Sequence, residues 1–152
     1  LIADANQDGT RDSYEDEFIE IENKSDHDIS LEGNSIAVGE KSDIRNIFSK
    51  DTTLEAGKAL VLFSGGSLTN LLQNCTAKLS KNSLKLSNSG SAIFILNGED
   101  VIDSINYQKG SGDNQSISRY PDITGDFIGY KSIKEANGLL YSVCTKIDGS
   151  YF

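Results

Sequence analysis

Near the start of the chain, a group of oxygen-bearing side chains has the types and the spacing of a cation-binding loop. Asp4, Asn6 and Asp8 stand at alternate positions, and Gly9 follows where such a loop must turn sharply. Calcium is a hard cation that takes about six to eight oxygen ligands, so a short loop must direct many oxygens inward. The segment fits the calcium-loop pattern D-x-[DN]-x-[DN]-G-x5-E, which ends here at Glu15.

The pattern also assigns roles to the later residues of the loop. Thr10 would offer its backbone carbonyl, Asp12 would act directly or through water, and Glu15 would bind with both oxygens. Because three acidic residues are consecutive from position 15, Asp16 is an alternative last ligand. A solvated acidic turn is the competing interpretation. We predict one calcium ion in the loop at residues 4–16, with candidate ligands Asp4, Asn6, Asp8, Thr10, Asp12, Glu15 and Asp16.

The segment after the loop predicts a strand rather than the helix of an EF-hand. In Phe18–Asn23, isoleucine and glutamate alternate, which is the periodicity of a strand with one buried face. Further strands are indicated at Ser35–Gly39, Ala59–Phe63, Ala92–Leu96, Val101–Tyr107 and Gln115–Tyr120. Short strands separated by Gly, Asn and Ser turns predict one all-β sandwich domain over residues 1–152.

Smaller features complete the predicted sandwich. Asn97-Gly98 is the strongest hairpin turn, since both residues tolerate positive φ. Ile47 and Phe48 are the expected buried pair of a short apolar run, and Phe127 opens a last apolar cluster that includes Tyr130. Residues 68–73 fit either a helical turn or a strand.

Composition excludes several classes of partner. The formal net charge is −9, which argues against binding to nucleic acid and to anionic lipid. No apolar run approaches the length of a membrane span.

The chain contains no Met and opens at Leu1, so we expect an excised domain or a processed product. Cys75 and Cys144 are the only cysteines, and we predict that they pair; two separate core thiols are the alternative.

No residue set in the sequence has the pattern of a catalytic site. His27 is the only histidine, lies in an acidic turn and has no nucleophile motif to serve. The loop Gly110–Gly112 lacks the lysine and helix start of a phosphate-binding loop. We therefore expect no enzymatic activity.

The order of several segments resembles the lamin tail domain. The matching segments are, in order, Phe18–Asn23, Asp28–Gly33, Thr53–Lys58, Leu86–Gly90, Leu96–Gly98 and Val101–Ser104. Gln115–Asp122, followed by Gly125–Phe127, is similar to the bacterial branch of that family, which also tends to begin with an acidic loop like residues 4–17. Two departures are Asn34-Ser35, where the family usually has Trp, and the ending Ile147–Phe152, where many relatives have a Thr-Pro-Gly turn.

The resemblance implies an immunoglobulin-like β-sandwich without shared catalytic residues. In bacteria such a domain is a non-catalytic module beside nucleases, phosphatases or adhesive domains. We therefore expect a monomeric interaction or spacer module of a larger secreted, cell-surface or periplasmic protein, with a structural calcium ion. Its partners would be other domains of the parent chain, a surface protein or a glycan. The alternatives are a carbohydrate-binding module using Tyr107, Tyr120 and Tyr130, and an accessory domain that contributes substrate binding to a secreted hydrolase or nuclease.

Overall fold

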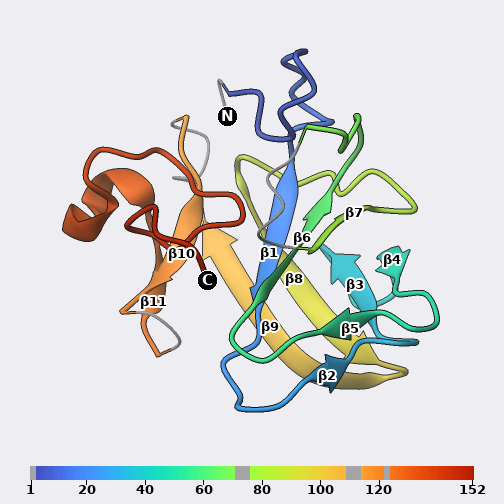
Figure 1. Ribbon diagram of the computed structural model, residues 1–152. Helices are drawn as coiled ribbons and strands as arrows, with labels where there is room; N and C mark the ends of the chain where they lie inside the picture. Colours follow the sequence, from blue (N-terminus) through green and yellow to red (C-terminus); the bar gives the residue numbers. More distant parts are fainter. Residues whose placement is uncertain (1–2, 71–75, 109–113, 122–123) are drawn as a thin grey trace.

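The computed structural model describes residues 3–70, 76–108, 114–121 and 124–152, and these residues are almost entirely strands and turns. A three-stranded sheet has the order β1-β6-β7, and a four-stranded sheet has the order β4-β3-β8-β9 (Figure 1). The strands are β1 (Phe18–Glu22), β6 (Ala59–Phe63) and β7 (Thr76–Leu79) in the first sheet, and β4 (Ile44–Ile47), β3 (Ser35–Val38), β8 (Gly90–Asn97) and β9 (Asp100–Gln108) in the second.

Two small two-stranded sheets complete the strand set. The strand β2 (Ile29–Ser30) pairs with β5 (Thr53–Leu54), and β10 (Ile117–Tyr120) pairs with β11 (Asp126–Gly129). Two short 3-10 turns follow, at Tyr130–Ser132 and Lys134–Ala136. In Figure 1 the β10–β11 hairpin stands beside the sandwich, together with the C-terminal tail.

The core strands form where the sequence predicted them. The apolar run Ala59–Phe63 is strand β6, and all five of its residues are buried. The strands β8 and β9 form the predicted hairpin, but its two-residue loop is Gly98-Glu99 rather than Asn97-Gly98, because Asn97 ends β8 and pairs with Asp100; Gly98 has a φ of +61°.

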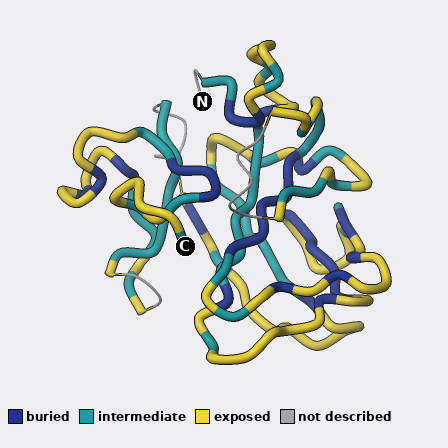
Figure 2. Tube along the Cα trace, viewed as in Figure 1, coloured by how far each residue is buried: buried dark blue, intermediate teal, exposed yellow. Residues whose placement is uncertain are grey.

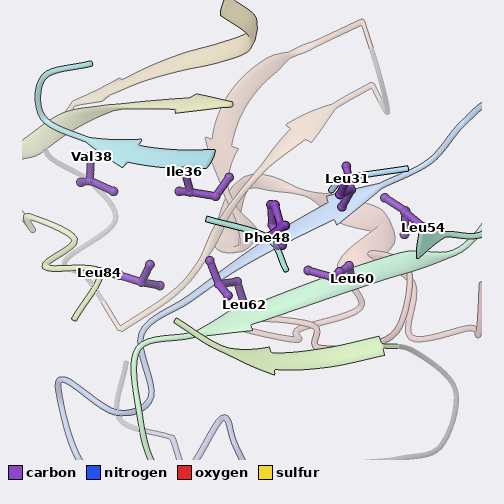
Figure 3. Close-up of a cluster of buried hydrophobic side chains, with 8 residues drawn as sticks. All are labelled: Leu31, Ile36, Val38, Phe48, Leu54, Leu60, Leu62 and Leu84. Carbon is purple, nitrogen blue, oxygen red and sulfur yellow. The ribbon is translucent and has the colours of Figure 1, made fainter. Parts of the chain in front are cut away.

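The main core lies between the two large sheets and has an immunoglobulin-like sandwich arrangement. Aliphatic side chains of β3 and β6 point toward one another across it, with Phe48 between them (Figure 3). The buried members of this inner cluster are Leu31, Ile36, Val38, Phe48, Leu54, Leu60, Leu62 and Leu84. Each buried aliphatic side chain contributes roughly 1.5–3 kcal/mol through removal from water, so this layer supplies most of the drive to fold.

The opposite face of the β1–β6 sheet is covered by the two ends of the described chain. Val61 and Phe63 of β6 pack there against Ala5 near the start and against Val143 and Cys144 near the end. The ring of Phe18 lies 5.8 Å from that of Phe63, centroid to centroid. Figure 2 shows buried residues within the C-terminal tail, although most of that tail is exposed. We call Ala5, Val61, Phe63, Val143 and Cys144 the outer cluster.

Some expectations from the sequence need correction. Phe48 is buried as predicted, but Ile47 is 56% exposed, because β4 is an edge strand and turns that side chain to solvent. Strand β7 was not predicted. It runs parallel to β6 and carries only two apolar residues, so its position depends on the pairing with β6. The undecided segment at residues 68–73 lies partly outside the described residues. Over the described ranges, the chain has no helix long and apolar enough to cross a membrane.

Candidate metal centre

In the acidic loop at residues 4–16, the aspartate carboxylates accept hydrogen bonds from backbone N–H groups of the same loop. The Asp4 carboxylate accepts hydrogen bonds from the backbone N–H groups of Asp8, at 3.0 Å, and of Gly9, at 2.9 Å. Gly9 has a φ of +91°, a conformation that glycine adopts without steric cost. The sharp turn expected at this position is therefore present, and it closes the first half of the loop.

Two further aspartates organise the backbone that follows. Asp8 accepts the Thr10 N–H through Oδ1 at 2.8 Å, and Asp12 accepts the N–H groups of Tyr14 and Glu15 through Oδ1 at 2.7 and 3.0 Å. These two N–H groups lower the pKa of the Asp12 carboxyl, because they stabilise its charged form.

Asp16 joins the two ends of the loop. It is 3% exposed, and its Oδ1 accepts the N–H groups of Ala5, at 2.7 Å, and Asn6, at 3.2 Å. Its Oδ2 accepts the Asp12 N–H at 2.8 Å. Glu15, by contrast, is exposed, with its side chain beside Gly65. Of the two alternative last ligands, Asp16 is the one that lies inside the loop.

The loop docks on the segment that follows β6. Asn6 is fully buried and donates through Nδ2 to the Gly65 carbonyl at 3.4 Å, and Ser67 N–H donates to Asp8 Oδ2 at 3.1 Å. At Gly66, with a φ of +83°, a Cβ would lie only 1.9 Å from Asn6 Nδ2. The glycines after β6 therefore let this backbone approach the loop, a contact that the spacing of the acidic residues does not reveal.

The donor set fits a hard cation. Asp4, Asn6, Asp8, Asp12 and Asp16 carry side-chain oxygens, the ligand type that calcium prefers, and the role of Thr10 as a carbonyl ligand stays a prediction. The burial of Tyr141 and the nearby charges of Asp4 and Asp16 raise the pKa of its phenol, so the tail lies close enough to the loop for its charges to act there. Among the described residues, no group of three or more Asp, Glu, His or Cys side chains is arranged so that it could hold a metal ion, so binding would require these carboxylates to move closer together.

A second ionisable group lies on the covered face of the first sheet. Glu20 Oε2 accepts the Cys144 N–H at 2.9 Å. Burial raises the pKa of Glu20 to about 7, with a further rise from Glu22, although the Cys144 N–H lowers it. Cys144 itself is 1% exposed in the outer cluster. Cys75 lies outside the described residues, so its pairing with Cys144 stays a prediction.

The residues considered for catalysis or for sugar binding are His27 and three tyrosines. His27 is in an exposed turn, and its Nδ1 lies 2.9 Å from Asp26 Oδ1. Tyr107 and Tyr130 are buried and Tyr120 is half-buried, so the three do not form an exposed aromatic platform. Gly110–Gly112 lies outside the described residues.

The fold and this loop together define a class: an immunoglobulin-like β-sandwich module with an acidic loop leading into its first strand. A model of the lamin tail domain family matches residues 1–109 of the chain, which is most of its length. The chain belongs to the lamin tail domain family, whose domains are non-catalytic, immunoglobulin-like interaction modules. A comparison with curated proteins gave no match.

Proposed function

We propose that the chain is a non-catalytic interaction or spacer module of a larger secreted or cell-surface protein, stabilised by one structural calcium ion in the loop at residues 4–16. Membership of the lamin tail domain family supports the module role. The predicted disulfide and a calcium-dependent loop both suit an oxidising, calcium-rich compartment. The partner is another domain of the parent chain or a separate surface protein.

The buried Asp16 carboxylate carries the proposal. It holds the backbone of Ala5, Asn6 and Asp12 in one compact turn, only two residues before β1 begins. Without a cation, the charges of Asp4, Asp8, Asp12 and Asp16 repel one another and oppose this turn. With calcium bound, the same charges become ligands, and the loop secures the start of β1 and the docked segment after β6.

Calcium binding to the folded loop alone adds stability by mass action. The gain is RT ln(1 + [L]/Kd), about 2.7 kcal/mol at a hundredfold excess over Kd. Magnesium should substitute poorly, because it demands smaller octahedral geometry. Extracellular modules typically bind calcium at roughly 0.1–1 mM, so the experiment should span that range.

The test is the melting temperature with calcium and with a chelator, for the wild type, Asp8→Ala and Asp16→Asn. We expect calcium to raise the melting temperature of the wild type and to have little effect on both variants. Glu15→Gln is the matched control, since the Glu15 carboxylate is next to Asp16 in the sequence but is exposed. This variant should keep most of the calcium response. Equal melting of the wild type in calcium and chelator would mean that the acidic turn is only solvated.

A further inference from the structure

A cleft opens between the free edges of β1 and β10, on the side of the sandwich where the β10–β11 hairpin stands (Figure 1). Its volume is about 470 Å3. All five residues of β1 line it, and so do Gln115 and Ser116, which precede β10, and Ile117–Arg119 of β10 itself. Side chains on both faces of a strand line the same cleft only when the edge of that strand faces it.

The edge of β1 presents unpaired backbone groups to this cleft. Glu17 O bonds to Ser64 N, and Asn23 N bonds to Lys58 O, on the side of β6. In the alternating pattern of an antiparallel ladder, the N–H and C=O groups of Phe18, Glu20 and Glu22 then point to the other edge. None of the described residues forms a hydrogen bond with these groups.

The floor of the cleft is apolar and only partly covered. Ile19 and Ile21 of β1 and Ile93 and Ile95 of β8 pack against the inner cluster, yet they line the cleft and remain half-buried. Tyr107, which is 8% exposed, also lines the cleft, and its hydroxyl has no hydrogen-bond partner among the described residues. Ser87 and Ser91 lie near that phenol without reaching it in hydrogen-bond geometry. A buried hydroxyl left unpaired favours a ligand that supplies a partner.

The rim of the cleft is acidic. Five carboxylates line it, from Asp16, Glu17, Glu20, Glu22 and Asp103, against two cations. Those cations are already paired: Lys24 with Glu22, and Arg119 with Asp103 at 3.7 Å. Of the other three, Asp16 is held inside the acidic loop and Glu20 accepts the Cys144 N–H, so Glu17 carries the excess negative charge that would attract a cationic ligand.

We propose that this cleft binds an extended peptide of alternating apolar and basic residues, which adds as a strand to the free edge of β1. The unpaired N–H and C=O groups of β1 would form the backbone hydrogen bonds to the added strand. Residues beside Ile19 and Ile21 would enter the apolar floor, and those beside Glu20 and Glu22 would face the acidic rim. This inference rests on the proposed role as an interaction module and names the chemical class of its partner.

The test uses short capped peptides of alternating lysine and valine, titrated into the whole domain and followed by calorimetry and by amide exchange in NMR spectra. We expect saturable binding and slower exchange of the N–H groups of Phe18, Glu20 and Glu22. A glutamate–valine peptide should bind at least about tenfold more weakly, because the rim repels it. A lysine–valine peptide with N-methylated backbone should also lose binding, because it lacks the donors for the ladder.

Glu22→Lys should weaken binding of the lysine–valine peptide about tenfold, whereas Glu32→Lys, an identical charge change at an exposed position outside the cleft, should not. Equal affinity for the acidic peptide, no saturable binding, or protected amides elsewhere than β1 would overturn the proposal. So would self-association that protects the same amides without peptide, because the occupant would then be a second copy. If the calcium-dependent rise in melting temperature persists in these cases, only the peptide site is wrong and the proposed calcium-stabilised module stands.

Discussion

The two faces of the β1–β6 sheet are covered in different ways. The inner face packs against β3 and neighbouring turns through aliphatic side chains, which interdigitate without polar partners. The outer face is covered by Ala5 from the acidic loop and by Val143 and Cys144 from the tail, with the buried carboxylate of Glu20 beneath them. Stability of the inner face depends on the burial of apolar surface alone. If the proposed calcium ion and the predicted disulfide are present, the stability of the outer face depends also on charge, on that ion and on that covalent bond.

The largest expected effect separates the two faces directly. Leu62→Ala removes a fully buried side chain of the inner cluster and should cost about 2–5 kcal/mol of unfolding free energy. The cost should be the same in calcium and in chelator, because the inner face does not touch the acidic loop.

Val61→Ala is the matched variant on the opposite face of β6, since Val61 is also fully buried. Its cost should be smaller in chelator, where the loop and Ala5 cover the outer cluster less well. Chemical denaturation of both variants, with and without calcium, measures the difference. An equal dependence on calcium in the two variants would show that the faces are not energetically distinct.

The predicted disulfide between Cys75 and Cys144 should have the next largest effect. It would close a long loop, for which chain entropy gives about 4 kcal/mol before strain is subtracted. Protein taken from an oxidising compartment, denatured without reductant, should contain no free thiol. Its unfolding free energy should fall when reductant is added, whereas that of the Cys75→Ser/Cys144→Ser double variant should not change. Two free thiols in the oxidised sample would favour two separate core cysteines.

Glu20 should make the outer face sensitive to pH. Its folded pKa of about 7 lies above the ordinary value of 4.5, so the folded state binds the proton more tightly than the unfolded state. Stability therefore falls as pH rises from about 4.5 to 7, and the full penalty applies above that range. Glu20→Gln should keep an acceptor for the Cys144 N–H and gain about 3 kcal/mol over the wild type above pH 7.

The measurement for Glu20 is the unfolding free energy of wild type and variant between pH 4 and 8, compared at each pH in the presence of chelator. Glu32→Gln, at an exposed position, should follow the wild type throughout. A constant difference between Glu20→Gln and the wild type across this range would mean that Glu20 titrates normally.

The contrast between the faces also explains what the sequence could predict. The strands β1, β6, β8 and β9 were predicted because their apolar runs and turns are local signals. Strand β7 was missed, since Thr76–Leu79 becomes a strand only beside β6. The exposed position of Ile47 was missed because the apolar pattern does not show that β4 lies at the edge of its sheet.

The acidic loop shows the same limit within one candidate site. The spacing identified its oxygen-bearing residues, but it left Glu15 and Asp16 as alternatives. Asp16 is inside the loop because its carboxylate reaches back to the N–H groups of Ala5 and Asn6, while Glu15 faces the glycines after β6. The side chain of Glu15 lies against Gly65, roughly fifty residues later in the chain, and no local pattern records that contact.

The smallest expected effect concerns the tail that covers the outer face. The hydroxyl groups of Tyr130 and Ser142 form a buried hydrogen bond, and Ser142 directly precedes Val143 and Cys144. Ser142→Ala should cost about 1 kcal/mol of unfolding free energy, because it removes a partner from a buried polar group. The double variant Ser142→Ala/Tyr130→Phe should lose less unfolding free energy than the sum of the two single variants, because Tyr130→Phe removes the hydroxyl that Ser142→Ala leaves without this hydrogen bond. A double-mutant cycle by chemical denaturation measures this coupling.

If the hydrogen bond holds the tail on the outer face, the cost of Ser142→Ala should also shrink in the Val61→Ala background, but not in the Leu62→Ala background. Strict additivity in both backgrounds would show that the tail and the outer cluster fold independently.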